Sequence, residues 1–466
     1  MRKLKMILTG SAGLLLTLSS PAMRAFAQTN SILLAPPDPQ IAAALHDVSA
    51  QHVRQTIEKL VSFQTRHTLS SDVPAASGKG INAAAEWIKS EFESYSKACG
   101  GCLEIKVDEF VQEPGTRIPK PTQVTNVYAI LRGHDPANAS RIVLVTGHFD
   151  SRNTETNDAT GASPGANDDA SGTAVSLECA RVLSQHHFPA TILFLTVAGE
   201  EQGLYGSAHF AKMARAQGWN IEAVLNNDIV GGDRTPGDTK QDPHTVRVFS
   251  EGIPATATES ELKLIRALGG ENDGASRQLA RYIDMVSKQY LQAAEFHPLV
   301  VFRRDRYLRG GDHMSFNDQG FAAVRITEYR ENYDHQHQNV RTENAIEYGD
   351  LIKFVDFSYL ANVTRLNAAT LASLASAPAP PVKVRVLTKA LQNDSTLVWE
   401  SSPGGLATGY LVLWRDTGAP DWEHAQAFGN VTQATLPVSK DNVVFAVQAT
   451  DSNGHRSLAV VPAPER

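Results

Sequence analysis

The spacing of apolar residues predicts alternating helices and strands through the first half of the chain. Apolar side chains recur with the period of an α-helix at residues 41–63, 81–95, 172–185 and 207–217. Strand-like runs occupy residues 103–111, 125–131, 142–145, 191–197 and 223–229. The runs at 142–145 and 191–197 are almost entirely apolar, as is typical of strands buried on both faces. We therefore predict an α/β fold with a mainly parallel, mixed sheet and helices on both of its faces.

The pattern changes at a stretch rich in alanine and proline, residues 375–381. Beyond it, turn residues separate short β runs, as in a small β-sandwich, at residues 382–386, 395–399, 409–414, 432–436 and 443–450. Trp399, Tyr410 and Trp414, with the run 443–447, resemble a fibronectin type III domain. We assign residues 377–381 to a linker and 382–466 to this domain. It has no residue set suited to catalysis, so we expect a tethered domain that binds larger targets or surfaces.

The N-terminus has the three parts of a secretory signal peptide. Arg2, Lys3 and Lys5 precede a mostly apolar run at residues 6–18, and Ala25-Phe26-Ala27 offers a cleavage site. We predict that residues 1–27 are removed after Ala27 and that the protein is secreted, into a periplasm or the medium. A membrane anchor is the alternative, but this run is too short to span a bilayer, and no other segment approaches that length.

Composition narrows the class of protein further. The chain has 466 residues, of which 42% are hydrophobic and 20% charged, as in ordinary globular proteins. Its formal net charge of −7 argues against nucleic acid as a partner, because phosphate binding needs concentrated lysine and arginine. Three cysteines are too few for a disulfide framework. We predict a local disulfide between Cys99 and Cys102, rather than a redox or zinc motif, and a buried free thiol at Cys179.

Polar residues cluster just after the predicted strands. They fall in the segments 147–151, 165–172, 199–204 and 226–228, and a similar segment, 310–313, comes later. Open α/β sheets bind ligands at the carboxyl ends of their strands, so these side chains are expected to converge. Any one of them alone is as readily a helix cap or a solvated loop residue. Together, imidazole and several carboxylates suit zinc or a similar divalent ion, and permit two ions with one carboxylate between them.

These segments resemble the zinc aminopeptidases of peptidase family M28, which use two co-catalytic zinc ions. The matching motifs are GHxDS at 147–151, NDDASG at 167–172, GEExGLxGS at 199–207, ND at 227–228 and DHxSF at 312–316. The resemblance implies a zinc-exopeptidase fold of the phosphorylase/hydrolase-like type for residues 28–376. It also implies five metal ligands, which are His148, Asp168, Glu201, Asp228 and His313.

The resemblance assigns a role to each of these residues. Asp168 is expected to bridge the ions, with Glu201 and His313 on one ion and His148 and Asp228 on the other. Glu200 is expected to be the general base, and Asp150 to orient His148. Two other clusters are interpreted as structural. These are the arginines at 303, 304, 306 and 309, with pairing to a substrate carboxylate as the alternative, and the segment Asp334–His337, taken as a surface or supporting segment.

The function implied is that of a secreted zinc-dependent exopeptidase acting on peptides or proteins. An aminopeptidase is the first hypothesis, with Glu200 accepting a proton from a water that bridges the ions. A carboxypeptidase or dipeptidase on the same metal centre is the main alternative. A glutaminyl-cyclase-like transferase, which acts with one zinc, and a non-catalytic binding protein are less favoured, since such binding relatives lose ligands and this sequence keeps the full set.

Overall fold

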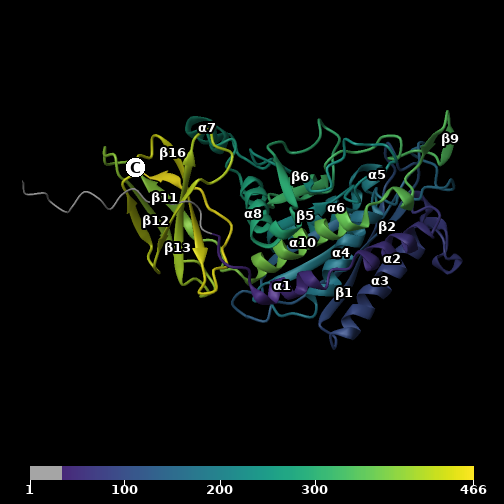
Figure 1. Cartoon of the computed structure of the whole chain (residues 1–466), viewed down its shortest axis with the longest axis horizontal. Coiled ribbons are helices and arrows are strands. Elements are labelled where there is room, and N and C mark those ends of the chain that lie inside the picture. Colours follow the sequence, from purple (N-terminus) through teal and green to yellow (C-terminus); the bar gives the residue numbers. More distant parts are fainter. Residues whose placement is uncertain (1–33, 466) are drawn as a thin grey trace, which may run out of the picture.

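An eight-stranded mixed sheet forms the centre of the larger part of the molecule (Figure 1). The computed structural model describes residues 34–465, so the predicted signal peptide lies outside the described residues. The strand order is β1-β2-β4-β3-β5-β8-β6-β7, and β4, β3, β5 and β8 run parallel to one another. The strands are β1 (Leu103–Gln112), β2 (Thr122–Leu131), β3 (Arg141–His148), β4 (Thr191–Val197), β5 (Asn220–Asn227), β6 (Thr245–Ser250), β7 (His297–Val301) and β8 (Ala323–Glu328). The predicted fold class is confirmed.

Helices cover both faces of this sheet because its central strands are apolar on both sides. Val143 and Val145 of β3 pack into one core, while Leu144 between them packs into the other. The first core is completed by α1 (Pro39–His46), α2 (Ala50–Val61), α3 (Gly80–Ala98), α4 (Ala170–Leu183), α8 (Ala275–Tyr290) and α10 (Phe357–Ser376). The second core is closed by α6 (Tyr205–Ala216) and α9 (His313–Asn317).

Capping explains one difference from the expected elements. The helical pattern at residues 41–63 forms two helices, α1 and α2, because Ser49 interrupts it. The Ser49 hydroxyl accepts a hydrogen bond from the amide of His52 at 3.3 Å and so begins α2. Asp38 begins α1 in the same way, through the amides of Gln40 and Ile41.

Short elements connect the strands and helices of this part. They are α5 (Glu200–Gly203), α7 (Glu259–Leu268), the hairpin of β9 (Arg341–Glu343) and β10 (Ile346–Tyr348), and the 3₁₀ turns η1 (Thr68–Asp72), η2 (Ala75–Ser77), η3 (Gln292–Ala294) and η4 (Ile352–Phe354). The structure contains the expected Cys99–Cys102 disulfide, and Cys179 is a buried free thiol. None of the helices within residues 34–465 has the length and apolar character needed to cross a bilayer.

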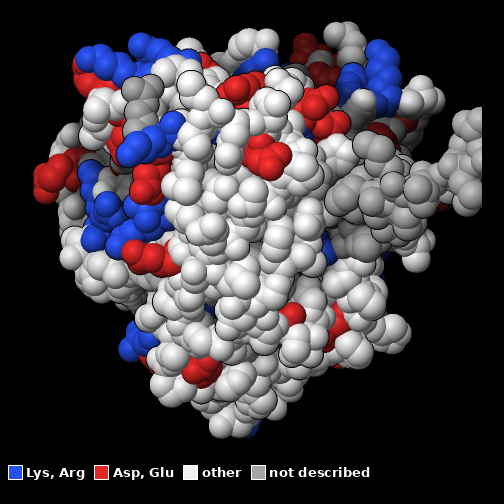
Figure 2. Space-filling view, turned by 90° about the vertical axis from the view of Figure 1, so that its left-hand side faces the viewer, with Lys and Arg blue, Asp and Glu red and all other residues white. Residues whose placement is uncertain are grey.

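The C-terminal part is a sandwich of two small sheets, at the left of Figure 1. One sheet has the order β15-β12-β11-β17 and the other β14-β13-β16, and Trp399, Tyr410 and Phe445 fill the core between them. The strands are β11 (Val382–Leu387), β12 (Ser395–Glu400), β13 (Gly409–Asp416), β14 (His424–Phe428), β15 (Gln433–Leu436), β16 (Val443–Thr450) and β17 (Ala463–Glu465). From this end of the molecule, uncharged side chains form a broad central area with charged residues mostly towards its margins (Figure 2).

The predicted linker at residues 377–381 begins with backbone that is held against the α/β part. Ala377 and Ala379 are buried, and the Arg141 guanidinium donates hydrogen bonds to the carbonyls of Ala377 at 2.8 Å and Pro378 at 3.3 Å. The sandwich is also held from the side, because Arg415 pairs with Asp273 at 2.6 Å. Buried carbonyls and charges need partners, so these contacts fix the sandwich against the α/β part.

One contact between the two parts makes their association dependent on pH. His455 of the sandwich lies between Asp451, at 2.8 Å, and Asp38 at the start of α1, at 3.1 Å. Burial disfavours protonation of this imidazole, but the hydrogen bonds and charges of the two carboxylates outweigh burial and raise its pKa above 6.5. Protonated His455 therefore stabilises the fold fully below about pH 6.5, and the stabilisation is lost as pH rises through the folded-state pKa.

We expect the melting temperature to fall by a few degrees more between pH 6 and pH 9 in the natural chain than in His455→Gln. Thermal unfolding of both chains across this range measures the difference. Parallel pH profiles for the two chains would contradict a stabilising role of protonated His455.

Candidate metal centre

The carboxyl ends of three parallel strands bring the predicted site residues to one edge of the sheet. His148 is the last residue of β3, and Asp228 directly follows β5. Glu200 and Glu201 begin α5, just after β4. Gly199 makes this turn at a φ of 77°, in the left-handed region that glycine adopts without steric cost.

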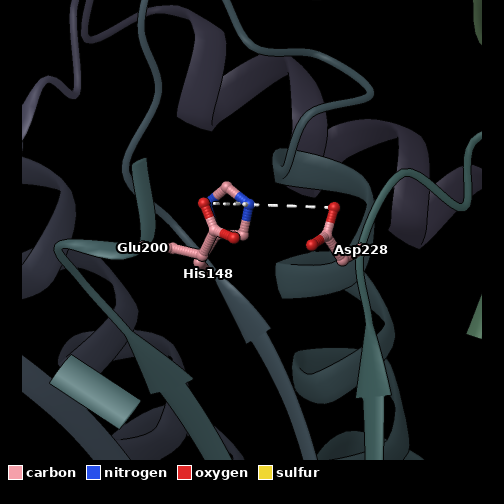
Figure 3. A group of neighbouring side chains, drawn as sticks. All are labelled: His148, Glu200 and Asp228. Atoms are coloured by element: carbon pink, nitrogen blue, oxygen red, sulfur yellow. Dashed lines mark ion pairs between the residues drawn. The ribbon is translucent and has the colours of Figure 1, made fainter. Parts of the chain in front are cut away.

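The first group of candidate ligands, called the His148 group, consists of His148, Glu200 and Asp228. The imidazole lies between the two carboxylates (Figure 3), with Nε2 3.9 Å from Glu200 Oε2 and 4.0 Å from Asp228 Oδ1. His148 is buried, and its Nε2 atom makes no hydrogen bond among the described residues. A buried ring nitrogen that faces carboxylates without a hydrogen-bond partner is the arrangement expected of a metal ligand.

The second group, called the His337 group, consists of Asp168, Glu201 and His337. His337 Nε2 lies 2.9 Å from Asp168 Oδ2 and 3.0 Å from Glu201 Oε1. Asp168 also joins the two groups, because its Oδ1 atom is 3.3 Å from His148 Nε2. One oxygen of Asp168 therefore faces each group, which is the geometry that a bridging carboxylate needs.

The structure does not bring His313 into either group. His313 begins α9, its Nε2 atom lies 2.8 Å from the carbonyl oxygen of Arg304, and burial lowers its pKa to about 4. His337, in the segment expected to be a surface or supporting one, stands where His313 was expected. The reason is topological: residues 334–337 follow β8, whose carboxyl end lies beside that of β5 at the site edge.

Asp150 lies where the sequence predicted, behind His148. Its carboxylate is 3.4 Å from His148 Nδ1, and its backbone carbonyl oxygen is 3.2 Å from the same atom. The carboxylate also accepts hydrogen bonds from the amides of Glu200 at 3.3 Å and Glu201 at 3.2 Å. One buried carboxylate thus fixes the imidazole and the start of α5 together.

Arg325 and Asp350 support the site without having been predicted from the sequence, and Gln336 supports it from the segment 334–337, which was expected to be a surface or supporting one. Arg325 pairs with Asp228 at 2.8 Å, and Gln336 donates a hydrogen bond to Asp168 Oδ2 at 3.1 Å. Asp350 accepts the amide of Asp168 at 2.7 Å. Recognition of β8 as a strand would have placed Arg325 within it and Gln336 beyond its carboxyl end, beside the site.

The electrostatics of the site separate Glu200 from an ordinary surface carboxylate. Burial raises the pKa of Glu200 well above its usual value, and the negative charges of Asp228 and Asp312 act in the same direction, against His148. Burial also raises the pKa of nearby Asp312 to about 7. Raised carboxyl pKa values at a cavity are typical of groups that transfer protons.

Comparison with known proteins identifies the class to which this site belongs. Residues 126–358 match the model of peptidase family M28. A "probable zinc metalloprotease" of Pyrenophora teres f. teres (strain 0-1) is 45% identical over 432 residues, which cover 92% of this chain and 88% of that protein. A protein of the same description from Pyricularia oryzae (strain 70-15) is 44% identical over 436 residues, covering 92% and 85%. The chain belongs to peptidase family M28 and is a zinc metalloprotease.

Solved structures share the fold at lower sequence identity. The LapA aminopeptidase of Legionella pneumophila superposes with a TM-score of 0.51 at 22% identity, covering 75% of this chain and 78% of that chain. The aminopeptidase of Aneurinibacillus sp. strain AM-1 gives a TM-score of 0.50 at 15% identity, covering 73% and 96%. The His148 and His337 groups, made of histidine and carboxylates, are consistent with two zinc ions in this fold.

Proposed function

We propose that this protein is an exported zinc exopeptidase, and specifically an aminopeptidase that uses Glu200 as its general base. The observation that carries the proposal is the position of Asp168, which presents one oxygen to each of the two groups. We assign one ion to His148, Asp228 and Asp168, and the other to Asp168, Glu201 and His337. When bound, the two ions would polarise the scissile carbonyl and activate a water molecule.

The residues of the chain divide the remaining work. Glu200 belongs to the His148 group and lines the cavity. Because the two ions are assigned to the other five residues, its carboxylate is left to accept a proton from the attacking water. The same carboxyl group then returns the proton to the departing amine. Asp150 holds His148 in orientation, and Arg325 holds Asp228 in place through the ion pair at 2.8 Å. A transferase that acts with one zinc would need only one of the two groups.

Two parts of the proposal concern the rest of the chain. Export is supported by the signal-peptide pattern and by the Cys99–Cys102 disulfide, since disulfides persist in oxidising compartments. The two-sheet arrangement of the sandwich is compatible with a fibronectin type III-like domain. We propose that this domain binds larger targets or surfaces.

The first test combines metal analysis with a panel of peptides. Protein purified without chelator is expected to hold about two zinc ions per chain, and a chelator should abolish hydrolysis until zinc is restored. The panel contains free-amine, N-blocked and C-blocked peptides of matched sequence. An aminopeptidase cleaves the free-amine and C-blocked peptides and spares the N-blocked one. One tightly held ion with full activity would contradict the two-ion assignment.

A carboxypeptidase or dipeptidase is the second candidate, and a specific observation favours it. Arginine side chains line the cavity beside the metal groups, and a guanidinium attracts a carboxylate while it repels a free amine. In the same panel, this candidate requires a free C-terminus, so the C-blocked peptide would be spared.

A further inference from the structure

The cavity beside the two metal groups has a rim of arginine side chains. Its volume is about 420 Å³, which is enough for a short peptide segment. The acidic residues that line it are Asp168, Glu200, Glu201 and Asp228, all of them members of the two groups. Apart from these groups, the charged residues of its lining are Arg117, Arg152, Arg306 and Arg309.

In the zinc-loaded enzyme, the arginine side chains are expected to dominate the electrostatic potential that a ligand meets in the cavity. Two divalent ions match the formal charge of the four carboxylates, so those carboxylates no longer offset the arginines. The substrate groups that enter the cavity therefore meet a cationic surface. This favours a carboxylate and disfavours a free amine near the arginines.

Arg117 is the most available of these arginines. It is exposed on the connection between β1 and β2, and its Nη1 atom donates a hydrogen bond to the backbone carbonyl of Glu201 at 2.9 Å. Within residues 34–465 no carboxylate lies within ion-pair distance of Arg117. One hydrogen bond thus holds its guanidinium next to the site and leaves further donors for a ligand.

In the segment between β7 and α9, Arg306 and Arg309 also line the cavity and share one buried carboxylate. Both pair with Glu331, which also pairs with Arg247 at 2.8 Å. A single negative charge cannot neutralise three guanidinium groups, and Asp305, 3.5 Å from Arg306, offsets only part of the excess.

Arg309 is the better placed of these two for a ligand. It is the more exposed of the pair, and its Nη2 atom donates to Gln336 at 3.2 Å. Gln336 in turn donates a hydrogen bond to Asp168. This chain of hydrogen bonds fixes the position of Arg309 relative to the metal centre. Arg152 is less available to a ligand, because it pairs with Glu201 at 3.0 Å and contacts His337.

We propose that Arg117 and Arg309 form a carboxylate-binding subsite for the substrate. The inference rests on the proposed peptidase function and deepens it: the preferred peptide carries a carboxylate close to the scissile bond. Planar guanidinium groups bind carboxylates through paired, charge-assisted hydrogen bonds, which makes arginine suited to this task. The carboxylate is either the C-terminus of a short peptide or an acidic side chain, and the test separates the two sources.

The kinetic test uses the full-length, zinc-loaded enzyme and two pairs of peptides. Leu-Leu against Leu-Leu-amide isolates the C-terminal carboxylate, and Leu-Glu-amide against Leu-Gln-amide isolates the side chain. We expect the carboxylate-bearing member of at least one pair to have a KM roughly tenfold lower. Arg117→Gln and Arg309→Gln should each raise that KM roughly tenfold, with kcat and the neutral peptide nearly unchanged.

Matched controls separate this role from a structural one. Arg303 is an exposed arginine of the same loop that stacks on Tyr307 at 4.1 Å and does not line the cavity. Arg303→Gln should therefore leave the KM values of the charged and the neutral peptides unchanged. Arg117→Lys keeps the charge but loses the planar fork, and should restore part of the preference. Increasing salt should weaken the preference in the natural enzyme and not in Arg117→Gln.

A binding experiment keeps the inference independent of turnover. Titration calorimetry of the same four peptides with the zinc-loaded Glu200→Gln protein should reveal tighter binding of the carboxylate-bearing member, and the added Arg117→Gln change should remove it. Two results would contradict the proposed subsite. One is equal affinity for the two peptides of each pair, and the other is an equal loss of affinity for charged and neutral peptides when Arg117→Gln is added. Loss of chelator-sensitive hydrolysis for every peptide, with the binding preference intact, would instead reject the proposed exopeptidase function.

Discussion

Glu200→Gln is expected to lower kcat roughly 10²–10⁴-fold while about two zinc ions stay bound. Glutamine is nearly isosteric with glutamate but cannot accept a proton from the attacking water. The group serves two proton transfers in the proposed reaction, so the loss should lie towards the upper end of this range. Binding of a short peptide should change little, because the side chain acts on the reacting atoms and not on the rest of the substrate.

Metal content distinguishes a base from a ligand at this position. Glu200 lies near both His148 and Asp228, so a ligand role would cost the variant the ion of the His148 group. Glu201→Gln is the matched comparison, because it removes a proposed ligand of the other ion and should reduce zinc content together with rate. Elemental analysis and turnover of both variants decide the matter. A fully active Glu200→Gln enzyme would contradict the base assignment.

His337→Gln is expected to reduce bound zinc from about two ions per chain to about one and to abolish most of the activity. His337 lies against both Asp168 and Glu201, and its replacement leaves the second ion with carboxylates alone. Dialysis against a weak chelator followed by elemental analysis measures the loss, and added zinc at high concentration should restore part of the rate.

His313→Gln is the control for this prediction. His313 is buried at the start of α9 and faces the carbonyl oxygen of Arg304, so its replacement should lower the melting temperature and leave zinc content per folded chain at about two. Circular dichroism establishes the folded fraction of each variant. The reverse outcome, with zinc lost in His313→Gln and kept in His337→Gln, would restore the ligand set expected from the sequence.

Local patterns were sufficient for much of the fold. The strand predicted at residues 191–197 coincides with β4, and the sheet is mixed and mainly parallel at its centre, as expected. These predictions succeeded because uninterrupted apolar runs in this part of the chain belong to strands buried on both faces. The hydrophobic pattern did not predict strands β6 to β8 or helices α8 and α10. Helix α10 is buried on nearly all of its faces, so its sequence lacks the amphipathic pattern of one polar and one apolar face that would have predicted a helix.

The same distinction holds for the site. The sequence by itself determined that His148, Asp228 and the pair Glu200-Glu201 would meet, because each directly follows a parallel strand and such strands end at one edge. Asp168 was predicted because it lies in the polar segment 165–172 that follows β3 and leads into α4.

Only the tertiary structure brought His337, and not His313, beside Asp168 and Glu201, and only it placed Arg117 and Arg309 around one cavity. The physical reason is that these residues reach the site through long irregular connections. Their positions depend on non-local contacts, such as the pairing of β8 with β5 and the hydrogen bond of Arg117 to Glu201, and no sequence periodicity encodes those contacts.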